Sequence, residues 1–284
     1  MNWKGSRLPI FALLAAATLL GSAYAARGDV PARILSINLC ADQLLVALAD
    51  RRQIAGLSRF ATDPEFSVAA QQAQSLPRTD QRSEAAIALQ PDLVLAGPSD
   101  RSAMRRVLAG LGLRVHEVPI VTDIARARTQ VREVAALIGQ PARGEALVAE
   151  IDAAQARLAA VAHGQGKTAL LVERKGYVTG PDSLAAALLR VAGFVPPVGA
   201  PHGLGGFIPL ERLLMLRPDV LMLHDVVTQA EDQGALFLTH PALAGLYPPE
   251  RRLFLPRRFS LCGGPALVAA LDYLTQVLSP PTRR

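Results

Sequence analysis

A phrase of twelve residues occurs twice in this chain, and it limits the possible folds more than any other feature. The first copy spans residues 84–95 and the second spans residues 211–222. In both copies a glutamate stands seven residues before a Pro-Asp pair, and an apolar run follows that pair. The copies begin 127 residues apart (211 − 84), which is too far for a solenoid or propeller repeat. The repeat therefore predicts two similar lobes in one chain.

The first 25 residues have the pattern of a secretory signal peptide. Lys4 and Arg7 precede an apolar stretch over residues 8–20, and residues 23–25 form a small-x-small cleavage site. The apolar stretch is shorter than the ~20 residues that a spanning helix needs. No cysteine stands at the cleavage site to carry a lipid. We therefore expect the mature chain, residues 26–284, to be soluble outside the cytoplasm and not lipidated.

The composition excludes two classes of protein. Half of the residues are hydrophobic and only 5% are aromatic, which indicates an aliphatic globular protein and not a disordered one. Removal of the signal peptide takes two basic residues and lowers the net charge from +6 to about +4. That charge is too mild, and its basic residues too scattered, for a nucleic-acid-binding protein. The mature length suits one large or two moderate domains.

Strand and helix patterns alternate in both halves, which predicts mainly parallel sheets with helices on their faces. In the first half we expect strands at residues 33–39, 54–58, 92–97 and 113–119, and helices at residues 41–49, 84–90 and 101–111. Ser83 is the expected N-cap of the second of these helices. In the second half we expect strands at residues 167–173, 220–224 and 252–256, and helices at residues 183–191, at Glu211 and at residues 265–278. Residues 203–206, which are rich in glycine, are expected to form a flexible loop.

The middle of the chain is helical. Residues 123–138 predict one helix, and residues 142–162 predict a second that Pro141 opens. At 1.5 Å per residue the second helix would be roughly 30 Å long. It fits a strut between two lobes, although a packed helix inside a single domain is the alternative. We therefore divide the mature chain into a lobe at 26–121, a helical linker at 122–164 and a lobe at 165–284.

Motifs of catalysis and of cofactor binding are missing from the sequence. No glycine-rich phosphate loop or Gly-x-Ser-x-Gly elbow occurs, and the five histidines do not form a paired metal-ligand motif. The adjacent His224 and Asp225 would point to opposite faces of a strand, which disfavours a relay between them. We expect neither enzyme activity nor a bound cofactor or metal ion.

Nearly the whole mature chain resembles the periplasmic substrate-binding proteins of ABC importers for ferric siderophores, haem and vitamin B12. The resemblance rests on residues 33–38, 54–58, 84–95 and 142–162 and on the second copy of the phrase. It implies two α/β lobes joined by one rigid helix, with the ligand in the cleft between them. It also implies a monomer that carries a metal chelate, foremost a ferric siderophore or similar iron complex, to a permease dimer. A cobalamin or corrinoid binder is the alternative in this class, and a secreted α/β enzyme using His224 or the cysteines is the alternative outside it.

The resemblance also implies a role for the glutamates that begin the two copies. Glu84 and Glu211 match the positions at which relatives pair one glutamate of each lobe with arginines of the permease. Two carboxylates on separate lobes would make a two-point electrostatic contact. The alternative is that each glutamate only stabilises the N-terminus of its helix through the helix dipole.

Ligands of doubly wound sheets bind beyond the carboxyl ends of the strands, and this rule selects the expected ligand-binding residues. Arginines in the set suit an anionic chelate, and its aromatic residues suit a flat or apolar portion. The expected ligand-binding residues are Asn38, Arg59, Phe60, Arg78, Ser99, Arg174, Tyr177, His202, His224, Arg257, Arg258 and Phe259.

The two cysteines, Cys40 and Cys262, are not explained by the family pattern. Each lies in an expected cleft-facing loop of a different lobe. An exported protein with an even number of cysteines favours a disulfide, which would limit the opening of the cleft. A soft-metal or chelate-metal site and two small buried side chains are the alternatives.

Overall fold

The structure is a computed structural model, and it describes residues 30–80, 82–98, 102–161, 164–224 and 232–279. The expected signal peptide lies outside the described residues. Residues from Pro31 onward form one compact unit that contains two sheets. No helix among the described residues is long and apolar enough to cross a membrane.

The sheet of the N-terminal lobe is parallel throughout, as the alternating pattern predicts. Its order is β2-β1-β3-β4, and its strands are β1 (Ile34–Ser36), β2 (Ile54–Gly56), β3 (Leu93–Ala96) and β4 (Arg114–Glu117). Alternate residues of β3 enter different hydrophobic clusters, since Leu93 and Leu95 pack on one face and Val94 and Ala96 on the other. This burial of both faces explains why the strand is a continuous apolar run.

The helices of this lobe are α1 (Leu39–Leu48), α2 (Ala70–Ala73), α3 (Ser83–Ala88) and α4 (Ser102–Gly110), with a 3₁₀ turn η2 (Arg51–Gln53). The expected cap of α3 was wrong by one residue, because Ser83 is the first residue of the helix and Arg82 holds the N-cap position. Arg82 makes no side-chain capping hydrogen bond. A local sequence pattern does not resolve such one-residue shifts at a helix end.

The sheet of the C-terminal lobe has the order β7-β6-β5-β8-β9. The strands β5 (Ala169–Val172), β8 (Val220–Leu223) and β9 (Arg252–Phe254) are parallel and agree with expectation. The strands β6 (Tyr177–Thr179) and β7 (Gly205–Phe207) pair antiparallel beside them, and neither was expected.

The expectation of a flexible loop at residues 203–206 was wrong in part, because β7 begins at Gly205. Gly205 has φ +122°, and a Cβ atom there would lie 2.2 Å from the carbonyl oxygen of Val178. The glycine therefore lets β7 approach β6 at a position where any side chain would collide. Close backbone approach explains this glycine, and flexibility does not.

The remaining described elements cover this sheet or lead to and from it. They are α7 (Leu184–Val191), α8 (Leu210–Leu216), α9 (Gln233–Leu238), α10 (Pro241–Leu246), α11 (Arg257–Ser260) and α12 (Pro265–Leu278), with the 3₁₀ turns η3 (Arg174–Gly176) and η4 (Pro249–Arg251). The α12 bounds coincide with the expected helix at residues 265–278.

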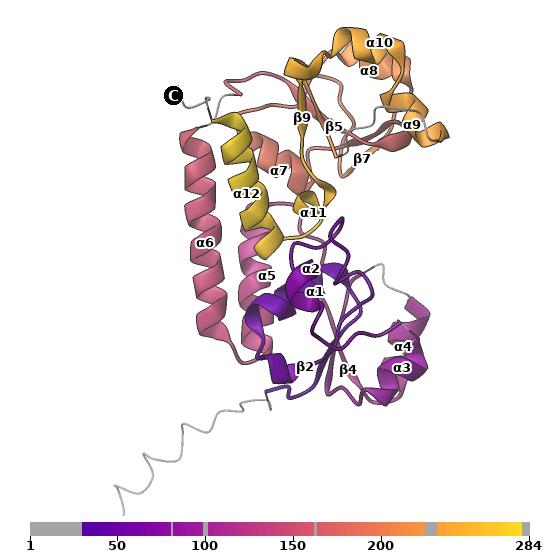
Figure 1. The fold of residues 1–284 in the computed structure, drawn as a ribbon, viewed down its shortest axis with the longest axis vertical. Helices are drawn as coiled ribbons and strands as arrows, with labels where there is room; N and C mark the ends of the chain where they lie inside the picture. Colours follow the sequence, from indigo (N-terminus) through magenta and orange to yellow (C-terminus); the bar gives the residue numbers. More distant parts are fainter. Residues whose placement is uncertain (1–29, 81, 99–101, 162–163, 225–231, 280–284) are drawn as a thin grey trace, which may run out of the picture. The chain divides into compact units, whose positions relative to one another are not determined.

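Two long helices connect the lobes. They are α5 (Ile124–Leu137) and α6 (Pro141–Ala160), and α6 packs along both α5 and α12 (Figure 1). The 20 residues of α6 correspond to roughly 30 Å. A Cβ atom on Gly144 would lie 2.5 Å from Cβ of Ala135, so glycine is what allows α5 and α6 to pack this closely.

One hydrophobic cluster runs through both lobes by way of α6. It contains Ile34 and Leu93 of the first sheet, Ile151 of α6, and Leu171 and Met222 of the second sheet, and all five side chains are buried. Each lobe also has a smaller cluster on the opposite face of its sheet. Because α6 contributes core side chains to the cluster that both sheets share, it is a structural strut and not a linker on the surface.

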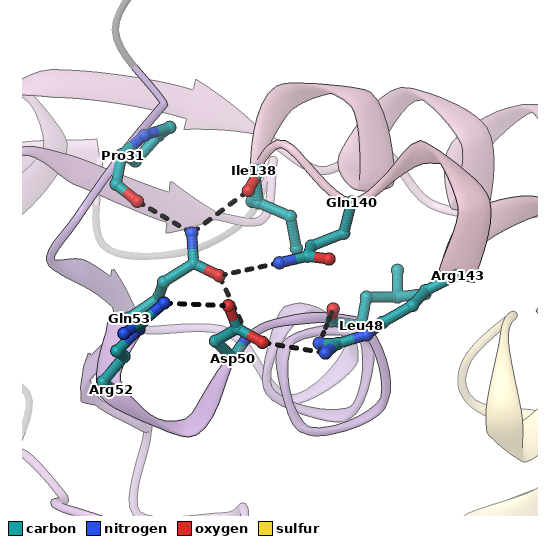
Figure 2. A network of polar contacts seen from close by, with 8 residues as sticks. All are labelled: Pro31, Leu48, Asp50, Arg52, Gln53, Ile138, Gln140 and Arg143. Carbon is teal, nitrogen blue, oxygen red and sulfur yellow. Dashed lines mark hydrogen bonds and ion pairs between the residues drawn. The ribbon is translucent and has the colours of Figure 1, made fainter.

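A polar network fixes the corner between α5 and α6 to the N-terminal lobe (Figure 2). The buried Gln53 side chain donates to the carbonyl oxygens of Pro31 at 2.9 Å and Ile138 at 3.1 Å. Arg143, in the first turn of α6, donates to the carbonyl oxygen of Leu48 and to the carboxylate of Asp50. These bonds satisfy backbone carbonyls at the corner and hold the start of α6 against the lobe.

The two copies of the repeated phrase have the same structure. In the first, the Asp92 carboxylate accepts hydrogen bonds from the backbone N–H groups of Ala32 and Arg33, just before β1. In the second, the Asp219 carboxylate accepts bonds from the backbone N–H and the hydroxyl of Thr168, just before β5. In both lobes the aspartate thus connects the strand that follows it, β3 or β8, to the neighbouring strand of the sheet.

The backbone of the two copies agrees as well. The residue before each proline, Gln90 in the first copy and Arg217 in the second, has a left-handed conformation with φ 46° and φ 43°. Non-glycine residues rarely adopt this region. The shared strain at equivalent positions indicates that both copies make the same tight exit from a helix into a strand.

Candidate functional site

A cavity of about 240 Å³ lies at the carboxyl end of the second sheet, against the segment that enters α5. This is the place that the strand-end rule predicts for a ligand. Most of its wall is apolar, with a few hydroxyl groups, one imidazole and one carboxylate. Its lining residues are Ile120, Val121, Thr122, Leu171, Glu173, Tyr177, Thr179, Ser183, Leu184, Ala185, Leu204, His224, Ser260 and Leu261.

Two polar side chains follow adjacent parallel strands into this cavity. Glu173 comes directly after β5 and His224 directly after β8. Nδ1 of His224 lies 2.8 Å from the carbonyl oxygen of Leu255, so Nδ1 carries the proton and donates it. The other ring nitrogen, Nε2, lies 3.4 Å from the hydroxyl of Ser260 and 3.8 Å from Oε1 of Glu173.

The antiparallel hairpin adds Tyr177 and Thr179 from β6 to the cavity wall. The hydroxyl of Tyr177 donates to the carbonyl oxygen of Leu204 at 3.3 Å, and its ring packs edge-on against Phe207 with 5.2 Å between centroids. These contacts hold the ring of Tyr177 in place beside the cavity.

The segment between β9 and α12 forms another part of the wall through Ser260 and Leu261. The next residue, Cys262, forms a disulfide with Cys40 of α1, and the two Cα atoms are 5.2 Å apart. The structure therefore contains the disulfide, the first of the three readings of the cysteine pair. This bond fixes one wall of the cavity to the N-terminal lobe.

The five expected arginines are not among the residues that line this cavity, although one of them lies close to a lining residue. Arg174 pairs with Asp232 at 2.5 Å, Arg78 donates to Thr62, and the guanidinium of Arg59 lies 4.6 Å from the ring centroid of Phe60. Arg258 stacks on Phe259 and donates to the carbonyl oxygen of Pro64. The guanidinium of Arg257 lies 3.9 Å from Oε2 of Glu173, which does line the cavity. The expected convergence of arginines is absent from the described lining.

The other expected ligand residues have various positions. Asn38 caps α1 by accepting from the N–H groups of Cys40 and Ala41. Phe60 packs against Phe66, Phe259 packs against Tyr273, and His202 is exposed in the loop before β7. Ser99 lies outside the described residues. Among the expected residues that the structure describes, only Tyr177 and His224 line the cavity.

Glu84 and Glu211 occupy equivalent places in the two lobes. Both lie in the first turn of their helices, α3 and α8, and both side chains are exposed. The position near a helix N-terminus suits a carboxylate, and the exposure leaves each one accessible to a partner.

Glu173 and Ser260 are among the lining residues that the sequence reasoning missed. Glu173 was placed inside its strand, although the strand-end rule would have selected it if the strand had been ended one residue earlier. Ser260 carries no sequence signal, because only the folding of α11 back toward β8 brings it to His224.

This arrangement does not make a hydrolase triad. In such a triad the carboxylate orients one ring nitrogen and the serine contacts the other. Here the carboxylate and the hydroxyl both face Nε2, and a backbone carbonyl occupies Nδ1. Asp225 lies outside the described residues. Among the described residues, no group of three His, Cys, Asp or Glu side chains is placed to hold a metal ion.

Comparison with known proteins connects this geometry to a family. The cobalamin-binding protein of Halobacterium salinarum is 29% identical over 181 residues, which cover 57% of this chain and 45% of that protein. The chain thus matches less than half the length of this relative. A periplasmic haem-binding protein from Pseudomonas aeruginosa has a TM-score of 0.70 at 22% identity, covering 89% of this chain and 94% of that one.

A protein of the ABC-type Fe³⁺-hydroxamate transport system from Saccharomonospora viridis has a TM-score of 0.67 at 22% identity, covering 88% of this chain and 94% of that one. At these identities the solved structures establish the two-lobed fold and not the ligand. The model of the periplasmic binding protein family matches residues 34–247, which is well over half of the chain. The chain therefore belongs to the periplasmic binding protein family.

Proposed function

We propose that this chain captures a metal chelate, foremost a ferric siderophore or a similar iron complex, and delivers it to an ABC permease. The observation that carries the proposal is the cavity at the strand ends of the second lobe, in a chain of the periplasmic binding protein family. Its wall is largely apolar with a few polar groups, which is typical of small-molecule sites. A chelate would pack its organic shell on the apolar wall and bond its polar groups to Tyr177, Ser260 and His224.

The size of the cavity bears on how a ligand would enter. Its volume of about 240 Å³ is below the roughly 300–1,000 Å³ of common ligand pockets. A chelate would therefore have to widen the cleft or extend beyond the cavity. The disulfide and the α6 strut would keep that movement small.

A cobalamin or corrinoid is the second candidate ligand. The similarity to a cobalamin-binding protein supports it, as does a described cavity lining that contains hydroxyl groups and no arginine or lysine. An uncharged, amide-rich ligand would suit such a lining better than a polyanion.

We further propose that the chain performs no chemistry and needs no cofactor. The relation of His224 to Ser260 and Glu173 supports this, because it lacks the orientation of a catalytic triad. The alternative of a secreted enzyme predicts product formation that disappears when His224 is replaced.

The proposed setting is the periplasm. The signal-peptide pattern of residues 1–25 supports export, and exposed Glu84 and Glu211 support docking of a monomer on a permease dimer. The division at residues 26–121, 122–164 and 165–284 is retained as the proposed domain organisation.

A thermal-shift screen of residues 26–284 tests the function. The probes are ferrioxamine B, ferric enterobactin, haemin and cyanocobalamin, each at several concentrations. A ligand present at 100 times its Kd should stabilise the fold by about 2.7 kcal/mol. Saturable stabilisation by at least one chelate with one-to-one stoichiometry and no product is expected. If no chelate shifts the melting temperature, or if one is converted to product, the proposal is wrong.

A further inference from the structure

Glu173 carries the one carboxyl group among the described residues that line the cavity, and no arginine or lysine stands among them. Its side chain is 26% exposed. It stands at the end of β5, which lies between β6 and β8 in the middle of the sheet. Because it follows a central strand, this side chain is held at the carboxyl edge of the sheet, where the cavity lies.

The carboxylate oxygens of Glu173 have room for a ligand donor. Oε1 is 3.8 Å from Nε2 of His224 and Oε2 is 3.9 Å from the guanidinium of Arg257. Both separations allow electrostatic attraction but exceed the length of a hydrogen bond. No described residue donates a hydrogen bond to this carboxylate, so its lone pairs can accept N–H or O–H groups that enter the cavity.

Nearby cations do not reverse the charge of the lining. Arg174, the next residue, is turned to Asp232, and Arg258 stacks on Phe259. Arg257 is not among the described lining residues, and its guanidinium lies 3.9 Å from Oε2 of Glu173. A ligand in the cavity therefore meets the carboxylate of Glu173, and no arginine or lysine stands among the described lining residues.

From this geometry we infer that Glu173 determines which ligands the cavity accepts according to their charge. A chelate with a cationic or neutral donor group toward β5 is accepted, and one with a carboxylate there is rejected. A charge-assisted hydrogen bond would favour the donor, and a second carboxylate would be repelled in a partly dehydrated site. This inference rests on the proposed function and adds the chemical class of the ligand, which is a non-anionic chelate.

The test uses ligands that differ only in charge. Ferrioxamine B carries a primary ammonium group, its N-acetyl derivative is neutral there, and its N-succinyl derivative ends in a carboxylate. If the thermal-shift screen selects a different ligand, the comparison uses a matched pair of that ligand with and without a free carboxylate. For a corrinoid the pair is cyanocobalamin and its monocarboxylic acid, and for haem it is haemin dimethyl ester and haemin. Affinities are measured by calorimetry for the unmodified protein, for Glu173→Gln, and for Glu250→Gln as a matched control on the exposed surface of the same lobe.

The unmodified protein and Glu250→Gln should bind the carboxylate member about ten to a hundred times more weakly than its neutral or cationic counterpart. Glu173→Gln should reduce that difference to within about threefold, chiefly by tighter binding of the carboxylate member. The inference is overturned if the unmodified protein binds the anionic member as tightly, or if Glu173→Gln keeps the full difference. Failure of every chelate to bind would instead refute the proposed function, so the two failures are distinct.

Discussion

The carboxylate of Asp219 accepts two hydrogen bonds from one residue, Thr168, at 2.8 Å from its backbone nitrogen and 2.8 Å from its hydroxyl. The Thr168 hydroxyl also accepts a bond from the backbone N–H of Asp219. This exchange joins the starts of β8 and β5, the two central parallel strands of the lobe. The aspartate of the repeated phrase is thus a structural residue, which separates its role from that of the exposed glutamate eight residues earlier.

The Asp219–Thr168 pair predicts an acid-dependent contribution to stability. The hydrogen bonds from Thr168 lower the pKa of Asp219 below its ordinary value of 3.8. Because the folded pKa is lower than the unfolded one, the contribution is complete above the unfolded pKa and is lost as the pH falls through the folded pKa. Asp219→Asn should lower the free energy of unfolding at pH 7 because it weakens these hydrogen bonds. The loss should be only about 1 kcal/mol, because Asp219 is exposed and solvent screens its charge.

Chemical denaturation between pH 2 and pH 7 measures this effect. The loss caused by Asp219→Asn should shrink as the pH falls below about 4. Asp182→Asn, at an exposed aspartate of the same lobe, is the matched control and should change little. If the variant lost the same free energy of unfolding at every pH, the ionised carboxylate of Asp219 would not be the source of the stability.

The left-handed conformation of Arg217 predicts that glycine is tolerated there and a branched residue is not. Arg217 has φ 43° and ψ 53°, a region that costs an L-residue about 1–2 kcal/mol and glycine little. Arg217→Gly should keep or slightly raise the free energy of unfolding, whereas Arg217→Val should lower it by about 1–2 kcal/mol. The same glycine substitution at exposed Met215, inside α8, should lower it by about 1 kcal/mol. Urea denaturation measures the free energy of unfolding of the three variants. If Arg217→Gly and Met215→Gly lost the same free energy, the backbone at Arg217 would not be strained.

Close packing of α5 on α6 predicts that Gly144 cannot be enlarged. A single added methyl group would lie 2.5 Å from Cβ of Ala135, so Gly144→Ala should lower the free energy of unfolding by about 1–3 kcal/mol. Gly110, at the end of α4, is the matched control, because nothing lies within 4 Å of its Cβ position. Gly110→Ala should be neutral or stabilising. Thermal melts compare the two variants, and similar melting temperatures would mean that the helices separate readily.

The disulfide predicts a joint effect on stability and on ligand binding. Cys40 and Cys262 close a loop with a sequence separation of 222, and loss of the bond should lower the free energy of unfolding by about 2–4 kcal/mol. The bond also anchors the segment that carries Ser260 and Leu261, so the affinity for the chelate should fall. A double Cys→Ala variant and the reduced protein should behave alike in thermal melts and calorimetry. Unchanged affinity in both would limit the disulfide to a role in stability.

Much of the architecture could be predicted from local patterns. The continuous apolar run of β3 and the helical spacing of α6 are properties of short segments, and the structure contains both. The hairpin of β6 and β7 could not be predicted in this way. Its pairing depends on Gly205 approaching Val178, two residues that are distant in the sequence, and three-residue strands have almost no periodicity to detect.

The candidate site was less predictable than the fold. The strand-end rule pointed to the edge of the second sheet at which the cavity lies, and it selected His224, which lines that cavity. It could not show that Arg174 would turn to Asp232, because the ion pair depends on the position of α9. Nor could it select Ser260, which reaches His224 only through α11. Side-chain partners depend on tertiary contacts that loop position alone does not define.

The exposed glutamates predict a separation of ligand binding from transport. Glu84 and Glu211 lie in the first turns of α3 and α8, outside the described cavity lining. Replacing both by lysine would invert the charges offered to a basic surface, and a like-charge contact at two points opposes docking. The double variant should therefore bind its chelate with unchanged affinity in calorimetry and fail in chelate uptake by cells that lack the unmodified protein.

Lysine near a helix N-terminus costs up to ~1 kcal/mol, so a melting curve must show that the variant is folded. A variant with the exposed Glu150 and Glu250 replaced by lysine controls for the change in net charge and should transport normally. Uptake that survives the Glu84 and Glu211 reversal would refute the docking role and leave the glutamates as helix-stabilising residues.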